Sequence, residues 1–131
     1  MGESLGLETN IISTELYDEA GIALKKIFSA EKENSVILAA GETSLTIPKK
    51  GGKGGRNLHL GLEAVKNKLI NGKDFQDSVF ISLASDGMDN SDAAGAIVDK
   101  NTIEKAEKLG LDANDYSNRF DSYSFFQKTG D

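Results

Sequence analysis

The sequence of 131 residues has no cysteine, one proline and one histidine. The absence of cysteine excludes disulfides, thiolate metal sites and a cysteine nucleophile, and it fits a reducing compartment. No apolar run approaches the roughly 18 to 20 residues that span a bilayer. Residues 1–10 also lack the basic region and apolar stretch of a secretory signal. We therefore expect a soluble, cytoplasmic protein.

The charge balance is acidic. The chain has 15 Lys and Arg against 21 Asp and Glu, which gives a formal net charge of −6. This balance argues against nucleic acid and anionic membranes as partners. Hydrophobic residues make up 38% of the chain and charged residues 27%, a composition typical of globular proteins. The length suits one domain with one core, and we expect a single domain over residues 1–131.

Hydrophobic patterning predicts alternating helices and strands. Apolar residues that recur three and four positions apart predict helices over about 13–29 and 57–70, the second ended by Asn71-Gly72. Short apolar runs predict buried strands at 35–40 and 78–85, and residues 43–47 alternate as a half-buried strand that could form a hairpin with the first. Residues 93–98 are ambiguous between strand and helix. The alternation favours an α/β fold, a layered sheet flanked by helices.

Short helices are expected toward the C-terminus. Asn101 and Glu104 make a plausible capping box for a helix that ends near Leu109, and Asp112 and Ser122 could each cap a further helix. His59 lies off the apolar stripe of its helix, so we expect it on the solvated face. The aromatic residues expected in a core or an interface are Tyr116, Phe120, Tyr123, Phe125 and Phe126.

A basic, glycine-rich loop over residues 49–56 is the first candidate site. It has four glycines and four cations in eight residues. Glycine lets backbone N–H groups approach a ligand closely, and the following helix N-terminus favours phosphate or carboxylate. Arg56 adds a guanidinium that can bind an anion through two hydrogen bonds. The loop matches neither a Walker A nor a dinucleotide-binding pattern, and a solvated basic turn explains it equally well.

An acidic loop over residues 85–95 is the second candidate site. It follows a predicted strand, and ligands of open α/β sheets bind beyond the carboxyl ends of strands. Asp86, Asp89 and Asp92 place three carboxylates in seven residues, a crowding that a cation or a basic partner would relieve. The pattern is not an EF-hand, because Met88 occupies its third position. A Mg²⁺ site of one or two carboxylates with substrate phosphates stays open, and so does a simple turn.

Several ordered segments of the sequence together resemble the MOFRL domain. Residues 41–43 followed by 54–57 resemble its GET…GGRN pattern. Residues 85–89 and 92–99 resemble its [ST]DG-x-D…DAAGA-x-x-D segment, and Asn114 with residues 121–126 resembles N…DSY-x-FF. The resemblance covers nearly all of residues 7–131.

The resemblance implies a function. MOFRL domains form the C-terminal part of class II glycerate 2-kinases, some of which carry the name hydroxypyruvate reductase. It implies ATP- and Mg²⁺-dependent phosphorylation of D-glycerate at a cleft with a larger N-terminal kinase domain. Arg56 would be the catalytic residue, and Asp86 and Asp89 would hold Mg²⁺. The residues expected to bind substrate or phosphate are Gly52, Lys53, Gly54, Gly55, Asn57, Ser85 and Asp86.

The sequence also departs from the family pattern. Leu58-His59 stands where the family often has Gln-Glu, and the family usually continues beyond Asp131 into a further Thr/Gly-rich segment. The N-terminal kinase domain is absent too. We therefore expect a fragment that is inactive by itself and works with an N-terminal domain, a companion chain or further copies of itself. The alternatives are a non-catalytic anion-binding or interaction module and, last, a hydroxypyruvate reductase, for which the dinucleotide fingerprint is missing.

Overall fold

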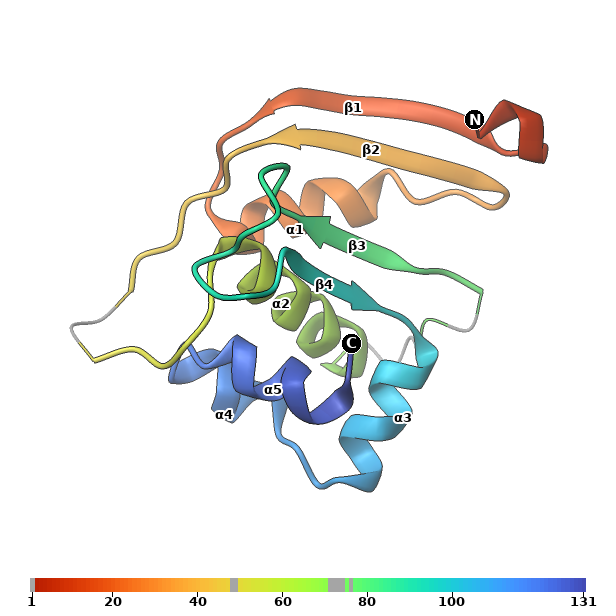
Figure 1. Cartoon of the computed structure of the whole chain (residues 1–131). Coiled ribbons are helices and arrows are strands. Elements are labelled where there is room, and N and C mark those ends of the chain that lie inside the picture. The colour runs from red at the N-terminus through yellow and green to blue at the C-terminus, as the bar shows by residue number, and fades with distance from the viewer. Residues whose placement is uncertain (1, 48–49, 71–74, 76) are drawn as a thin grey trace. The chain divides into compact units, whose positions relative to one another are not determined.

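The computed structural model describes residues 2–47, 50–70, 75 and 77–131 (Figure 1). The chain forms two compact units, Met1–Leu45 and Thr46–Asp131. Each unit contains a two-stranded sheet and at least one helix. The predicted α/β class, with small sheets flanked by helices, is confirmed. Among the described residues, no helix is both long enough and apolar enough to cross a membrane.

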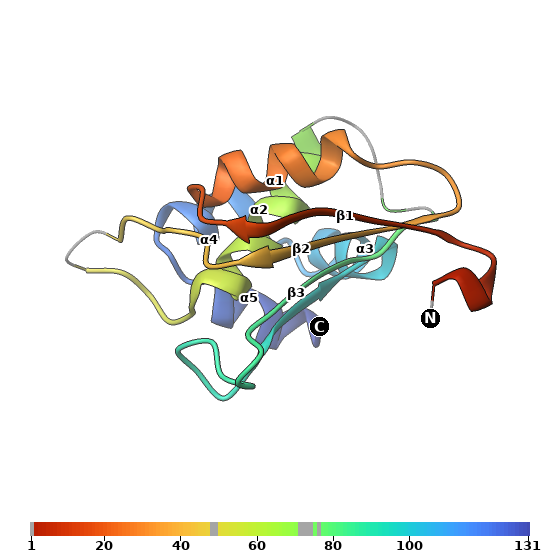
Figure 2. The ribbon, with the colours of Figure 1, turned by 90° about the horizontal axis from the view of Figure 1, so that it is seen from above.

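The first unit is a parallel strand–helix–strand arrangement. Its elements are a 3₁₀ turn at Glu3–Leu5, strand β1 at Glu8–Leu16, helix α1 at Ala20–Ser29 and strand β2 at Ser35–Gly41. The two strands pair in parallel from Glu8 opposite Ser35 to Leu16 opposite Gly41. Parallel neighbours need a crossover connection, which α1 provides. Figure 2 shows α1 running alongside this strand pair.

The helix predicted over 13–29 is wrong in its first part. Strand β1 continues through Leu16, and its β-branched residues Ile11, Ile12 and Thr14 favour an extended backbone over a helix. The helix begins at Ala20 instead. The carboxylate of Glu19 caps it by accepting the N–H of Gly21 at 3.1 Å.

The strand predicted over 35–40 is confirmed as β2, but its predicted hairpin is wrong. β2 pairs with β1, and residues 43–47 hold only one isolated bridge, between Ser44 and Glu19. β2 is also half-buried to exposed rather than buried. The apolar run identified the strand correctly, but it carried no information about the partner.

The second unit is organised around one long helix. Its strands are β3 at Phe80–Leu83 and β4 at Gly95–Val98, paired antiparallel, and its helices are α2 at Arg56–Ile70, α3 at Lys100–Lys108, α4 at Ala113–Asn118 and α5 at Ser122–Thr129. Helix α2 contacts both strands and all three later helices. Leu58, Leu62 and Val65 of α2 are fully buried with Phe125 of α5 and Val98 of β4. This central packing fixes the position of the α2 N-terminus.

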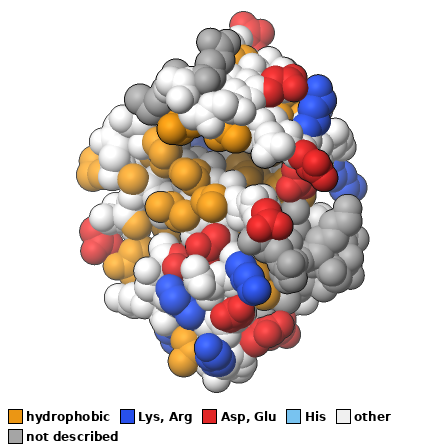
Figure 3. All heavy atoms as spheres, turned by 90° about the vertical axis from the view of Figure 1, so that its right-hand side faces the viewer, with side chains coloured by type: hydrophobic (Ala, Val, Ile, Leu, Met, Phe, Trp, Pro, Cys, Tyr) orange, Lys and Arg blue, Asp and Glu red, His pale blue; other side chains and the backbone are white. Residues whose placement is uncertain are grey.

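The predicted helix over 57–70 is confirmed as α2, and its predicted end at Asn71-Gly72 lies outside the described residues. The strand expected over 78–85 is shorter and buried on one face only, since Ile81 and Leu83 are more than half exposed. The ambiguous segment 93–98 forms β4. Neither β3 nor β4 contains a charged residue. Figure 3 shows hydrophobic side chains gathered on one face of the surface.

The capping box predicted for α3 is displaced by two residues. Asp99, not Asn101, precedes the helix, and its Oδ1 accepts the backbone N–H of Thr102 at 3.1 Å. The Thr102 hydroxyl returns the contact by accepting the N–H of Asp99 at 3.2 Å. Thr102 therefore takes the part that the pattern assigned to Glu104. The predicted end of the helix near Leu109 is confirmed.

The two last helices begin differently from one another. Asp112 caps α4 as predicted, because its Oδ1 accepts the N–H of Asn114 at 2.8 Å. Ser122 does not cap α5 but is its first residue, and Asp121 precedes it. The side chain of Asp121 makes no capping hydrogen bond to α5. That carboxylate accepts the hydroxyl of Ser124 in α5 and the N–H of Lys53 in the basic loop.

Candidate functional site

The basic loop and the acidic loop lie against each other in the second unit. The Asn90 side chain donates to the carbonyl oxygen of Gly54 at 3.2 Å. The Lys53 ammonium lies 3.4 Å from a carboxylate oxygen of Asp92. Both contacts join segments more than thirty residues apart in the sequence. The fold therefore brings the two candidate sites together at the N-terminus of α2.

Asp89 of the acidic loop occupies the N-terminus of α2. Its side chain is buried, with the residue only 5% exposed. One carboxylate oxygen accepts the N–H of Asn57 at 3.1 Å, and the other accepts the N–H of Leu58 at 2.7 Å. The first N–H groups of a helix have no partner within the helix, and a negative charge there interacts favourably with the positive end of the helix dipole. Asp89 thus supplies an internal anion to this helix end.

Two glycines of the basic loop make this contact feasible. A Cβ at Gly55 would collide with the carboxylate of Asp89, and a Cβ at Gly54 would collide with the hydroxyl of Ser122. Gly54 also has a backbone φ of +142°, which residues other than glycine rarely adopt. The glycines at these positions are therefore explained by the close approach of neighbouring segments.

Asn57 links three elements of the site. Its side-chain amide donates to Asp89 at 3.3 Å, and its side-chain oxygen accepts the hydroxyl of Ser82 in β3 at 2.8 Å. Both its backbone N–H and its side chain are thus engaged within the protein. Its predicted contact with phosphate stays a prediction.

Lys53 is held by the segment that begins α5. Its N–H donates to Asp121 Oδ1 at 3.3 Å, and its carbonyl oxygen accepts the N–H of Tyr123 at 3.0 Å. Its ammonium lies 3.6 Å from the centre of the Tyr123 ring, a cation–π contact. Sequence reasoning assigned Tyr123 to packing and gave Asp121 no role in the site. The DSY motif was the signal that could have identified both residues.

Asp92 is exposed but electrostatically stabilised. The hydroxyl of Tyr123 donates a hydrogen bond that, together with a backbone N–H and the charge of Lys53, lowers the pKa of Asp92 below its ordinary value. The three residues form one small charged cluster at the edge of the basic loop. The Lys53 ammonium is directed to this cluster, and its predicted contact with phosphate stays a prediction.

Arg56 is the first residue of α2 and is exposed. It directly precedes Asn57, whose backbone Asp89 fixes. Ser85 and Asp86 are exposed in the connection from β3 to β4. One oxygen of Asp86 accepts the N–H of Met88 at 3.1 Å, which closes a local turn.

The backbone donors available to an anion are fewer than the sequence suggested. Within the described part of the chain, the N–H groups of Gly52, Lys53 and Asn57 already donate to acceptors of the protein itself. The N–H groups of Gly54 and Gly55 make no such bond among the same residues. These two donors belong to the residues immediately before Arg56 in the sequence.

The acidic loop fits the predicted Mg²⁺ site only in part. The described residues contain no group of three or more His, Asp or Glu side chains that could hold a metal. Mg²⁺ bound with substrate phosphates needs only one or two carboxylates. Asp86 offers an exposed carboxylate for this purpose, whereas both oxygens of Asp89 accept hydrogen bonds from α2. The pairing of these two residues around a metal stays a prediction.

His59 is buried, so the expectation of a solvated side chain is wrong. The residue is 6% exposed, its ring stacks on Phe120 at 5.1 Å, and its Nε2 lies 3.7 Å from a carboxylate oxygen of Glu63. The apolar stripe marked only one side of α2. Because helices and strands contact this helix on several sides, His59 is buried although it lies outside the stripe.

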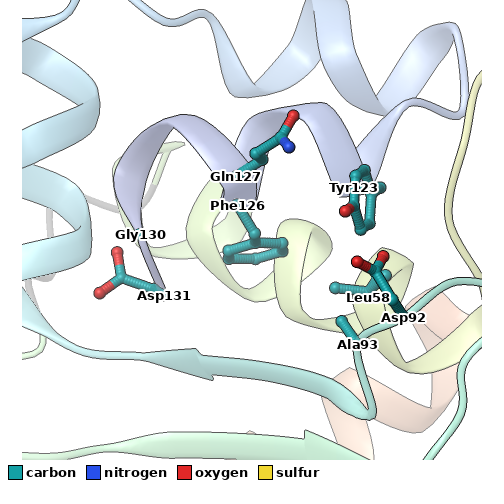
Figure 4. A pocket seen from close by; sticks show the side chains of 8 residues that line it. All are labelled: Leu58, Asp92, Ala93, Tyr123, Phe126, Gln127, Gly130 and Asp131. Carbon is teal, nitrogen blue, oxygen red and sulfur yellow. The ribbon is translucent and has the colours of Figure 1, made fainter.

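A hollow of about 240 Å³ lies beside the joined loops (Figure 4). Tyr123 and Asp92 lie close together at one end, and Asp131 lies at the other. The lining residues are Leu58, Asp92, Ala93, Tyr123, Phe126, Gln127, Gly130 and Asp131. The lining thus combines apolar side chains, among them Leu58 and Phe126, with the carboxylates of Asp92 and Asp131.

Comparison with known proteins gives a consistent result. A model of the MOFRL family matches residues 35–131. The chain is 32% identical to a glycerate 2-kinase of Pyrococcus horikoshii, over 98% of this chain and 30% of that protein. It is also 32% identical to a D-glycerate 2-kinase of Thermotoga maritima, over 99% of this chain and 33% of that protein. The chain thus spans about a third of the length of these curated relatives.

Solved structures agree with these relatives. A crystal structure of a Pyrococcus horikoshii protein matches with a TM-score of 0.84 and 31% identity, over 98% of this chain and 31% of that one. A crystal structure of glycerate kinase from Thermotoga maritima matches with a TM-score of 0.79 and 29% identity, over 98% of this chain and 33% of that one. The family match covers well over half of the chain, and the fold and the sequence segments that resemble the family agree with it. The chain belongs to the MOFRL family.

Proposed function

We propose that this chain is the MOFRL part of a glycerate kinase and contributes to ATP-dependent phosphoryl transfer to D-glycerate. The observation that supports this most is the meeting of the basic and acidic loops at the N-terminus of α2, in a chain similar to named glycerate kinases. Since the chain spans about a third of those relatives, the N-terminal kinase domain would come from further polypeptide or from a companion chain. The reaction would take place in the cleft between the two.

Phosphoryl transfer depends on positioning and on neutralising negative charge, with little covalent chemistry for the protein itself. In this proposal, the exposed Arg56 guanidinium binds the transferring phosphoryl group or the glycerate carboxylate. The N–H groups of Gly54 and Gly55 hold phosphate oxygens. Ser85 and Asp86 orient the hydroxyl groups of glycerate. Gly52, Lys53 and Asn57 contribute by shaping the loop that presents these donors.

Mg²⁺ would accompany the phosphates of ATP. When bound, it would neutralise phosphate charge, and Asp86, whose side chain is exposed, would be the acidic-loop carboxylate that contacts it. Arg56 supplies the complementary positive charge from the protein. The backbone donors at Gly54 and Gly55 add directional hydrogen bonds that a metal ion cannot provide.

The test is the formation of 2-phosphoglycerate from D-glycerate and ATP. The chain is assayed alone, with a polypeptide carrying the missing N-terminal domain, and with that polypeptide alone. Product is expected only when both parts are present. A mixture that binds inorganic phosphate but forms no product would contradict the kinase proposal and favour a non-catalytic anion-binding module.

A further inference from the structure

Asp89 differs from the two other aspartates of the acidic loop. Asp86 and Asp92 are exposed, whereas Asp89 is 5% exposed. Buried carboxylates are costly unless hydrogen-bond donors surround them. Asp89 has such donors on both oxygens, from the N–H groups of Asn57 and Leu58. Its burial is therefore explained without a bound cation.

The burial and the hydrogen bonds of Asp89 leave little access for a metal ion. Mg²⁺ demands near-octahedral geometry and binds carboxylate oxygens at about 2.0–2.1 Å. Oδ1 of Asp89 already accepts two hydrogen bonds from Asn57, so the second lone pair of Oδ2 is the one left for a cation. Mg²⁺ dehydrates reluctantly and keeps several waters, for which a residue that is 5% exposed leaves little room. The geometry at this aspartate thus favours the helix over a cation.

The bonds of Asp89 act on the residues around Arg56. Asn57 follows Arg56 directly, and Asp89 holds both its backbone N–H and its side-chain amide. Gly55 precedes Arg56, and it packs so closely on Asp89 that no Cβ fits between them. The backbone on both sides of Arg56 is therefore fixed by one carboxylate.

We propose that Asp89 is a positioning residue that fixes the N-terminus of α2 and thereby orients Arg56, and that it is not a ligand of a divalent cation. The significance of orienting Arg56 rests on the proposed kinase function. The cap itself does not rest on it. The carboxylate of Asp89 also accepts the N–H groups of Asn57 and Leu58 at the start of α2. A substrate anion would therefore bind to Arg56 and to the N–H groups of Gly54 and Gly55.

Amide hydrogen exchange on the chain itself tests the cap. Asp89→Asn keeps the size of the side chain but loses the charge and one acceptor. Exchange at Asn57 and Leu58 is expected to accelerate about five- to tenfold, in line with the value of a helix cap. Asp86→Asn is the matched control, and it should leave both amides unchanged. Unchanged exchange in Asp89→Asn would overturn the proposal.

Mn²⁺ tests the metal assignment, because its paramagnetism broadens nearby NMR signals. We expect either no broadening around Asp89 in the native chain, or broadening of the acidic loop that Asp86→Asn removes and Asp89→Asn preserves. Broadening that only Asp89→Asn removes would overturn the proposal. Should that variant not fold, broadening centred on Asp89 in the native chain would overturn it equally.

Activity of the assembled kinase provides the third measurement. Asp89→Asn is expected to lower kcat at least tenfold while the Mg²⁺ concentration for half-maximal rate stays unchanged. A metal ligand would raise that Mg²⁺ requirement instead. If the assembled protein has no kinase activity, the proposed function fails, while hydrogen exchange and Mn²⁺ broadening still decide the role of Asp89.

Discussion

The N–H of Lys53 donates a 3.3 Å hydrogen bond to the carboxylate of Asp121, which lies 68 residues later in the sequence. The carbonyl oxygen of Lys53 accepts the N–H of Tyr123 at 3.0 Å. The N–H and the carbonyl oxygen of Lys53 are therefore both hydrogen-bonded to the segment at the start of α5. A loop rich in glycine has little conformational preference of its own, so these two hydrogen bonds restrict its conformation.

Asp121→Ala is expected to loosen the basic loop. The substitution removes the acceptor of the Lys53 N–H and of the Ser124 hydroxyl, which lies 2.7 Å from Asp121 Oδ1. The free energy of unfolding should fall by about 1–2 kcal/mol, and trypsin should cleave after Lys53 more rapidly. Denaturant titration and limited proteolysis measure these effects.

The matched control for that change is Asp115→Ala. Asp115 is exposed on α4, and its ion pair with Arg119 at 3.3 Å lies on the surface. Exposed ion pairs contribute about 0–1 kcal/mol, so the control should change stability little and leave the loop resistant. Equal cleavage of the two variants would show that Asp121 does not hold the loop.

Gly55→Ala tests the close contact between the two loops. The new methyl group would collide with the carboxylate of Asp89 and force the loops apart. Overpacking of this kind costs about 1–3 kcal/mol. In the control Gly21→Ala the methyl group would lie 3.3 Å from Glu19 Oε2, the oxygen that caps α1. The gain of about 0.5–1 kcal/mol from a helical alanine and the disturbance of that cap act in opposite directions, so thermal denaturation should shift far less in the control than in Gly55→Ala.

Sequence patterns predicted the features that local signals determine. The apolar period marked α2, and the glycine-rich loop before it placed the helix start within one residue of Arg56. Asp112 was identified as a cap because its carboxylate accepts the N–H of Asn114, only two residues later in the sequence. Such signals are complete within a few residues, and they needed no knowledge of the remaining fold.

Features that depend on distant partners were not predictable in this way. Strand β2 pairs with β1 in parallel, across the crossover helix α1. The apolar run that marks a strand does not indicate which other strand it pairs with. The burial of His59 depends on Phe120, which approaches from beyond α4. The inward turn of Asp89 depends on the N–H groups of α2. From the sequence, Asp89 was indistinguishable from the exposed Asp86.

Stability at low pH should depend on Asp99. The N–H of Thr102 is the main cause of a pKa below the ordinary value of 3.8 for this carboxyl group, and the Asn101 side chain contributes further. A lowered folded-state pKa means that the stabilisation is present above the unfolded-state pKa and is lost as pH falls through the folded-state value. The cap should therefore weaken below about pH 4.

Asp99→Asn separates charge from capping, because asparagine still presents an oxygen to Thr102. The variant should be less stable than the native chain at pH 7, and the difference should shrink as pH falls below about 4 toward the folded-state pKa of Asp99. Denaturant titrations at pH 7 and at a series of lower pH values measure this difference. A difference in the free energy of unfolding that stays constant with pH would show that the charge of Asp99 does not stabilise the folded state.

Arg56→Ala should separate function from stability. Arg56 is exposed at a helix N-terminus, where a positive charge does not favour the helix, so its removal should change the free energy of unfolding by less than about 0.5 kcal/mol. In the assembled kinase the rate should fall on the order of 10³-fold, because an arginine that stabilises phosphoryl-transfer charge contributes that much. Lys108→Ala, which removes an exposed cation from α3, should leave the rate unchanged. Similar rates for the two variants would remove Arg56 from the mechanism and leave the joined loops without a catalytic group of their own.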